Sequence, residues 1–399
     1  MTNVETPLAT AVLFLYALCA VMIVGLVVLF ALKIRNSSAD NKARHCQEKY
    51  RDYFVYLQAH GEEEERLKVP HGEVTQSEKQ IMQKKLFELM ELFTGVHRQK
   101  LIWLCEDLGL IELDRKRLKG AWKWTRVDAA YNLGMMRSKE ALPDLLQLLE
   151  KSSYDPSIFI IARSIARCAR DTGDLREMVL LLVRYKKNFH ELIVDILSDS
   201  QIDTAPLFAS FLRETSTDLV KIGLIGLLAQ SQSQPGIESA LYKLIESEDK
   251  DIRIKAVKLV CQDVRYLTEQ RVKAFMNHKD WEIRAMMAKA VGGLGLAGYI
   301  PMLKSAVGDS SWWVRHHSAY SLTALEVEGF AALCEILREE RMGNKLQMAH
   351  EVIQEELEKG KRQAAATQDV EKQLQYNQKL HLYHKSYRKT ISTVAALER

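Results

Sequence analysis

The chain has 399 residues, of which 47% are hydrophobic, and its 56 Lys and Arg side chains nearly balance its 52 Asp and Glu side chains. The net charge of +4 argues against bulk binding of nucleic acid, which needs a large positive excess. The six cysteines are scattered singly, as in reduced proteins, and no cysteine or histidine pair has the short spacing of a structural zinc site. We therefore expect neither a nucleic-acid partner nor a metal.

The first predicted element is an uncharged apolar segment, residues 8–32, which begins at Leu8 and ends at Leu32. Its length suits a helix that crosses a bilayer with some tilt. The residues before it carry only Glu5 as a charged side chain, whereas a cleaved signal peptide has a basic start and a shorter apolar core. The sequence predicts an uncleaved transmembrane anchor after a short extracytoplasmic N-terminus, residues 1–7.

Basic residues follow the apolar segment. Lys33, Arg35, Lys42 and Arg44 surround a single acid, Asp40. The positive-inside rule then places the rest of the chain in the cytoplasm. We expect a single-pass protein of the cell membrane with its N-terminus outside.

Two predicted regions separate the anchor from the next part of the chain. Residues 33–76 contain an amphipathic helix over 39–59 and a charged linker over 61–72, with four consecutive glutamates. Residues 77–122 contain helices, the first capped by Ser77. We expect these helices to cap the end of a helical array, because a terminal unit must cover an apolar face on one side only.

The region 123–358 repeats one pattern at intervals of 30 to 33 residues. Each unit has an anchor position followed by small or apolar residues three, four and seven places later, which form one buried helix face. The anchors are Arg126, Ile158, His190, Val220, Arg253, Arg284 and Arg315, and a fainter unit begins at Leu346. Such a period predicts about seven stacked helical hairpins.

Prolines and glycines support the same register. Pro143, Pro206, Pro235 and Pro301 follow their anchors by 15 to 17 residues, where they would start the second helix of a hairpin. Glycines in the first helices would allow close approach between neighbours. They are Gly134, Gly223, Gly226, Gly292 and Gly293.

Three segments resemble the HEAT repeat family of α-solenoids: Asp-Lys-Asp-Ile-Arg at 249–253, Asp-Trp-Glu-Ile-Arg at 280–284 and Trp-Trp-Val-Arg at 312–315. The resemblance implies an all-α, right-handed α-solenoid of HEAT-like hairpins, here preceded by one transmembrane helix. It also implies a structural ladder between neighbouring units, made by Arg126, Asp249, Arg253, Asp280, Arg284 and Arg315.

The pattern departs from the family in two places. Ser311 replaces the acid of the last clear unit, and the units anchored at Ile158, His190 and Val220 lack the arginine. We therefore expect the middle of the array to be irregular or bent. The chain also resembles bacterial membrane-anchored HEAT proteins, a resemblance that suggests a glycosyltransferase as a membrane-enzyme partner.

Tryptophans recur at one place in the last two clear units. Trp281 and Trp312 are 31 residues apart, and Trp313 follows directly. Packing between repeats is the favoured interpretation, and binding of a partner protein is the alternative.

The C-terminal region, residues 359–399, is predicted to be a basic amphipathic helix, because it lacks Pro and Gly over 361–399 and has apolar residues at helical spacing. Its basic side would carry Lys379, Lys385, Arg388 and Lys389. The helix would either bind anionic lipid or fold back as a cap on the last hairpin, and both interpretations stay open.

We find no catalytic set and no cofactor motif. His381 and His384 share a helix face without a third ligand, so we expect no metal there. The favoured function is a membrane-anchored scaffold that recruits or regulates a protein partner without being an enzyme. The alternatives are a HEAT-like enzyme related to bilin lyases and a sensor of anionic lipid.

Overall fold

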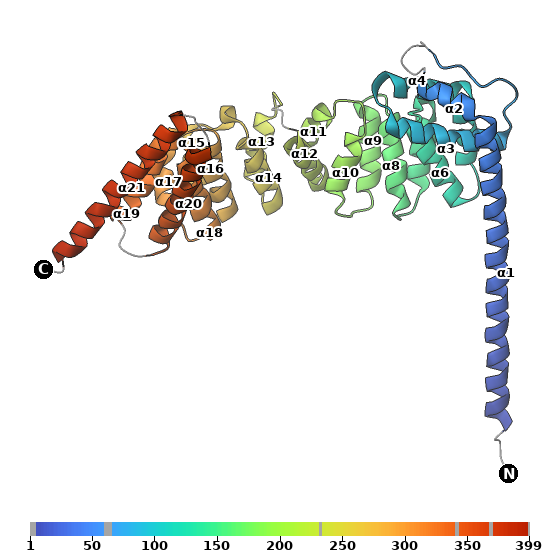
Figure 1. Cartoon of the computed structure of the whole chain (residues 1–399), viewed down its shortest axis with the longest axis horizontal. Coiled ribbons are helices and arrows are strands. Elements are labelled where there is room, and N and C mark those ends of the chain that lie inside the picture. The colour runs from blue at the N-terminus through green and yellow to red at the C-terminus, as the bar shows by residue number, and fades with distance from the viewer. Residues whose placement is uncertain (1–4, 60–65, 231–233, 340–342, 367–369, 398–399) are drawn as a thin grey trace. The chain divides into compact units, whose positions relative to one another are not determined.

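The computed structural model describes residues 5–59, 66–230, 234–339, 343–366 and 370–397 (Figure 1). Within these ranges every regular element is a helix and none is a strand. The chain divides into two units, Met1–Tyr185 with Asp199–Ile202, and Lys186–Ser198 with Asp203–Arg399. The predicted array therefore contributes hairpins to both units.

The first helix is longer than the sequence predicted. Helix α1 (Glu5–Lys49) continues unbroken through the apolar segment into the basic region, and α2 (Arg51–Ala59) follows. The separate helix expected to begin at residue 39 is thus mostly part of α1, because residues 33–49 contain neither glycine nor proline to end it. The predicted run of glutamates at 62–65 lies outside the described residues.

The C-terminal end of α1 is fixed to the first unit. Lys49 Nζ lies 2.7 Å from Glu78 Oε1, and Cys46 and Tyr50 are buried beside it. Glu78 also accepts a hydrogen bond of 2.9 Å from the backbone N–H of Thr75, whose side chain caps α3. The helix therefore begins after Thr75, two residues before the predicted cap at Ser77, because Thr75 and Glu78 form a capping box.

The remaining helices of the first unit are those of the predicted capping region, residues 77–122, and those of the first hairpins. Helix α5 packs on α6, and each later helix packs on its neighbours. In chain order they are α3 (Gln76–Leu92), α4 (Gly95–Asp107), α5 (Leu110–Leu118), α6 (Lys123–Met135), the 3-10 turn η1 (Lys139–Ala141), α7 (Leu142–Lys151), α8 (Ser157–Cys168) and α9 (Thr172–Val183).

The second unit consists of helical hairpins followed by two longer helices. They are α10 (His190–Ser198), α11 (Ala205–Phe211), α12 (Thr217–Ala229), α13 (Glu238–Ile245), α14 (Lys250–Val260), η2 (Val264–Tyr266), α15 (Glu269–Met276), α16 (Trp281–Gly293), η3 (Ala297–Tyr299), α17 (Ile300–Ala306), α18 (Trp312–Ala324), α19 (Glu326–Glu339), α20 (Asn344–Ala366) and α21 (Val370–Leu397).

The repeat period matches the hairpins. The seven anchors lie in the first turns of α6, α8, α10, α12, α14, α16 and α18, and within each unit these helices pack on one another in sequence. Pro143, Pro206 and Pro301 lie in the first turn of their second helices. Pro235 instead precedes α13 by three residues and lies in the loop.

Glycines allow close approach between the first helices of neighbouring hairpins and also between the two helices of one hairpin. A Cβ on Gly134 would lie 2.7 Å from Ser164 Oγ, and one on Gly292 would lie 2.5 Å from Ser321 Cβ, so these glycines let α6 meet α8 and α16 meet α18. Gly226 faces the ring of Phe208 within the hairpin formed by α11 and α12. The expectation was wrong for Gly293, where a Cβ would meet no atom within 4 Å.

Helix α21 covers one face of the second unit over its described side chains. It packs on α19 and α20, with Lys379 Nζ 2.8 Å from Glu356 Oε1 and 5.7 Å from the Phe330 ring centre. Gln354 Nε2 also donates a hydrogen bond of 2.9 Å to the hydroxyl of Tyr383. These contacts are those of a cap on the last hairpin.

Candidate functional site

Four contacts between a basic side chain and a carboxylate connect successive first helices of the second unit. His190 Nε2 lies 2.8 Å from Asp218, and Lys221 Nζ lies 2.8 Å from Asp249. Arg253 Nη2 lies 2.7 Å from Asp280, and Arg284 Nε lies 2.8 Å from Asp309. We call these four pairs the inter-repeat ladder.

The ladder uses residues that sequence reasoning missed. Two of the three units without an arginine form such pairs: one uses His190 itself, and the other uses Lys221, which is one position beyond the anchor Val220. Asp309 pairs with Arg284 from two positions before Ser311, where the acid was expected. Two sequence signals could have revealed these pairs. One is a basic residue at or next to the anchor position of a repeat, and the other is an acidic residue near the start of the next first helix.

Arginine also fixes the loops between hairpins. Nη1 of Arg253 donates to the carbonyl of Ser247 at 2.6 Å, and Nη1 of Arg315 donates to that of Asp309 at 2.9 Å. The Nε atoms of Arg126 and Arg315 are buried without a hydrogen-bond partner among the described residues. In those residues neither arginine contacts a carboxylate, unlike Arg253.

The ladder lowers the pKa values of three of its carboxyl groups, those of Asp249, Asp280 and Asp309. Hydrogen bonds from Lys221 and Arg253 hold the pKa values of Asp249 and Asp280 below their usual range. Burial favours the neutral form of Asp309, but hydrogen bonds from Arg284 and the backbone of Ser311 still leave its pKa lowered. The three pairs made by Asp249, Asp280 and Asp309 are thus ionised, structural contacts rather than a proton-transfer site.

The tryptophans lie at the surface. Each of the six is at least 39% exposed, whereas tryptophan is highly buried on average. Trp281 is the first residue of α16 and Trp312 the first of α18, and no ring contact joins the two among the described residues. Trp312 and Trp313 are 47% and 51% exposed, which does not fit the favoured interpretation of packing between repeats.

The rings of α18 form a continuous aromatic row. Trp312 and Trp313 meet edge to face with centroids 4.9 Å apart, and Trp312 lies 4.7 Å from the ring of His316. His316 in turn stacks on Tyr320 at 4.3 Å. We call Trp312, Trp313, His316, His317 and Tyr320 the α18 aromatic surface.

Two side chains of this surface, His317 and Tyr320, have pKa values shifted toward their neutral forms. Burial and the charges of His316 and Lys289 lower the pKa of His317. The hydroxyl of Tyr320 donates to the Glu355 carboxylate, which raises the pKa of Tyr320 to about 12. The surface therefore presents apolar rings with neutral polar edges.

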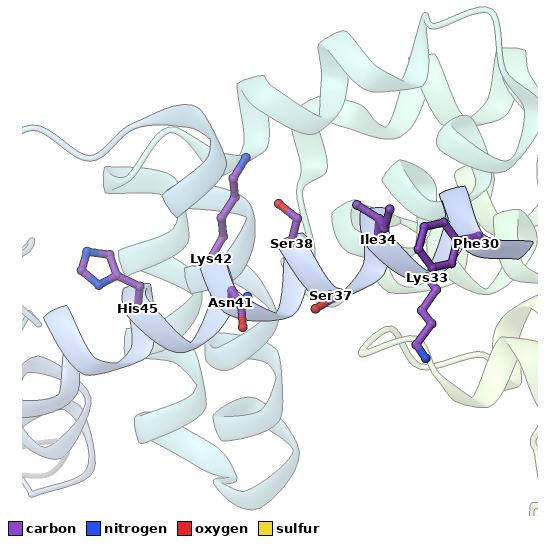
Figure 2. A pocket seen from close by; sticks show the side chains of 8 residues that line it. All are labelled: Phe30, Lys33, Ile34, Ser37, Ser38, Asn41, Lys42 and His45. Atoms are coloured by element: carbon purple, nitrogen blue, oxygen red, sulfur yellow. The ribbon is translucent and has the colours of Figure 1, made fainter. Parts of the chain in front are cut away.

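The predicted membrane anchor, residues 8–32, lies within helix α1. Of the predicted span, Leu8 lies within α1 but its side chain is outside the described residues, and Leu32 is exposed. Figure 2 shows the part of α1 where the apolar segment ends and the basic region begins. Apolar, polar and basic side chains line a shallow depression there. Its lining residues are Phe30, Lys33, Ile34, Ser37, Ser38, Asn41, Lys42 and His45.

The basic residues of α21 do not form one open face. Lys379 is 15% exposed and paired with Glu356, so it is occupied within the protein. Lys385 is exposed. The side chains of Arg388 and Lys389 lie outside the described residues.

The described residues contain no group of three or more His, Cys, Asp or Glu side chains that could hold a metal. Five of the six cysteines are buried, and all six are free. Burial raises the pKa of Cys168 to about 12 and that of Cys261 to about 12, so these thiols are neutral at physiological pH.

Two family models match parts of the chain: PBS lyase HEAT-like repeat over residues 125–151 and HEAT repeats over residues 268–344. A search of curated proteins finds no match.

Among solved structures, the chain is similar to YibA from E. coli, with 14% identity over 64% of this chain and 99% of that chain, and a TM-score of 0.35. It is similar to Kap121p, with 12% identity, 86% and 44% coverage and a TM-score of 0.43. It is similar to a chain of the Pds5–Scc1 complex, with 13% identity, 84% and 60% coverage and a TM-score of 0.33. The chain thus spans less than half of Kap121p.

The two model matches fall on α6 with α7, and on α15 to α19, where the anchors and hairpins repeat. In these two regions the chain carries HEAT-like repeats.

Proposed function

We propose that this protein is a membrane-anchored scaffold that binds a protein partner through the α18 aromatic surface. The observation that carries the proposal is the pair of half-exposed, edge-to-face rings of Trp312 and Trp313. Contact of an apolar tryptophan ring with water is unfavourable in the free protein. Tryptophan is also enriched among the residues that dominate binding energy at interfaces. The neighbouring imidazole and phenol rings extend the same apolar area.

Helix α1 supports the anchor. Residues Val12–Ile34 form a stretch of 23 residues that is long and apolar enough to cross a membrane, and none of its most apolar part is buried within the chain. A signal sequence would pass the same test of length. The unbroken course of α1 to Lys49, whose end is held by Glu78, favours an anchor that is retained.

The basic residues after the span favour a cytoplasmic location for both units. A membrane enzyme such as a glycosyltransferase is then the proposed class of partner, on the resemblance to bacterial membrane-anchored HEAT proteins. The proposed role is recruitment rather than catalysis, because the ladder and the aromatic surface supply contacts and no nucleophile with a base.

The test is affinity purification of the full chain from detergent-solubilised membranes, in parallel with a deletion of residues 1–35 and the double variant Trp312→Ala/Trp313→Ala. We expect a membrane protein to co-purify with the full chain, and the double variant to recover at least about ten-fold less, as hot-spot truncations do. Trp122→Ala, which removes a still more exposed ring outside this surface, is the control.

Undiminished recovery with the double variant would reject the α18 aromatic surface as the binding site. A partner kept equally by the deletion would reject a role for the anchor in recruitment. A chromophore-modified protein in place of a stable partner would favour the lyase-related alternative, which the match of residues 125–151 to a PBS lyase HEAT-like repeat keeps open.

A further inference from the structure

Three arginines from different elements of the first unit are near enough for the charges of two of them to act on the third, and none belongs to the surfaces described above. Arg98 belongs to α4, Arg137 follows α6 and Arg167 belongs to α8. Burial and the charges of Arg98 and Arg167 lower the pKa of Arg137. We call these three residues the arginine cluster.

Several donors at the cluster are buried without an acceptor. Among the described residues, Arg98 Nε, Arg137 Nη1 and Ser138 Oγ have no hydrogen-bond partner, and Ser138 is only 4% exposed. Arg167 Nη1 donates to the thioether sulfur of Met135 at 3.3 Å, which is a weak acceptor. Leaving buried charged donors unpaired is unfavourable, so the site is incomplete as it stands.

The Asp199 carboxylate contacts one member of the cluster, Arg167, and also Arg163, which lies outside it. Asp199 Oδ2 lies 2.8 Å from Arg163 Nη1 and 3.3 Å from Arg167 Nη2. It therefore leaves the unpaired atoms of Arg98 and Arg137 without an acceptor. Asp199 is shared by Arg163 and Arg167, so the guanidinium groups of Arg98 and Arg137 keep about two positive charges at neutral pH that this carboxylate does not contact.

The backbone at Arg137 points to a retained role for its side chain. Its φ of 49° lies in the left-handed region, at a helix end where glycine or asparagine is the usual residue. The amide of Arg137 donates to Gly134 O at 3.2 Å and that of Ser138 donates to Leu133 O at 3.2 Å, so the turn is well fixed. An arginine here accepts backbone strain that a glycine would avoid.

We propose that the arginine cluster and Ser138 bind a phosphate-type oxyanion, either inorganic phosphate or the terminal group of a small phosphomonoester. Such an anion carries a charge of about −1.5 to −2 at neutral pH, which matches the local excess, and offers several strong acceptor oxygens. Guanidinium groups suit these oxygens because their N–H groups form a rigid planar fork. The anion would accept from the three buried donors, and its site would be independent of the proposed partner surface.

The test uses the full chain in detergent, with thermal unfolding and calorimetric titration of inorganic phosphate against chloride at equal ionic strength. We expect phosphate to raise the melting temperature in a saturable way, as a ligand of the folded state does. Arg137→Gln and Arg98→Gln should each weaken phosphate binding at least ten-fold. Lys139→Gln, which removes an exposed charge nearby, should leave it unchanged.

The unliganded variants provide a second readout. Without phosphate, Arg137→Gln and Arg98→Gln should melt no lower than the parent chain, because each removes a like charge from a crowded site. Lower melting of both variants would mean that the arginines have a structural role, and would overturn the proposal. A phosphate effect equal to that of chloride, or kept in both variants, would overturn it as well.

Titration with glycerol phosphate separates the two sources of the anion. Tighter binding of glycerol phosphate than of inorganic phosphate would support a phosphomonoester, and the reverse order would support the free ion. With either ligand, Arg98→Gln and Arg137→Gln should weaken binding.

Discussion

Two adjacent glycines at the end of α16 have very different surroundings. A Cβ on Gly292 would lie 2.7 Å from Ser321 Cα, whereas one on Gly293 would meet open space. We expect Gly292→Ala to lower the free energy of unfolding of the second unit by about 1–3 kcal/mol, because α16 and α18 must separate. Gly293→Ala, its control in the same helix, should be neutral or stabilising by up to about 1 kcal/mol. Equal effects in urea titrations of the two variants would contradict the assigned helix contact.

Arg253 joins two structural roles in one side chain, since it donates to a loop carbonyl and to Asp280. Replacement by glutamine should cost about 1–3 kcal/mol, because Asp280 is then left partly buried without its cation. Arg265, which is 70% exposed and pairs with its near neighbour Asp263, is the control, and Arg265→Gln should cost less than about 0.5 kcal/mol. Chemical denaturation measures both; an Arg253→Gln variant as stable as the control would leave the ladder without an energetic role.

At the scale of the elements, the inter-repeat ladder makes stability depend on pH. The pKa values of Asp249, Asp280 and Asp309 lie below the usual value of 3.8, so folding favours their ionised forms. Their contribution is complete above that usual value and is lost as pH falls through the lowered folded pKa values. Asp280→Asn removes one such group.

We therefore expect the stability difference between the parent chain and Asp280→Asn to shrink as the pH is lowered from 6 to about 3. Thermal unfolding at a series of pH values measures this difference. A constant or growing difference on acidification would show that Asp280 contributes through something other than its ionised contact with Arg253.

The elements also show what sequence reasoning can and cannot reach. The spacing of the anchors predicted the hairpins because a buried helix face leaves a periodic signal. It did not predict the pairing of Arg284 with Asp309, because a long side chain can reach any acid near the next helix start. Likewise, Trp312 and Trp313 were predicted as a partner-binding alternative, but their exposure depends on how α18 packs. The row from Trp312 through His316 to Tyr320 was missed, although its four-residue spacing on one helix was readable in the sequence. The arginine cluster was missed entirely, since its members come from three separate elements.

At the scale of the whole molecule, α21 protects the last hairpin. Phe330 of α19 is fully buried with Lys379 of α21 over its ring. Deletion of residues 367–399 should uncover this face, lower the melting temperature of the second unit and increase light scattering. Lys385→Gln, an exposed change on the same helix, should do neither. Unchanged melting and scattering after the deletion would leave membrane binding as the better account of α21.

The continuity of α1 also has a geometric consequence. From Ile34 to Lys49 the helix has no break, and its end is clamped by Glu78, whose pKa is lowered to about 2 by Lys49 and Thr75. At about 1.5 Å per residue, these 15 steps span roughly 22 Å. On the proposed anchor, α1 is therefore a rigid spacer rather than a tether, and it fixes a stand-off height between bilayer and first unit. Insertion of a flexible glycine-rich segment after Ile34 would abolish that height while leaving every repeat intact.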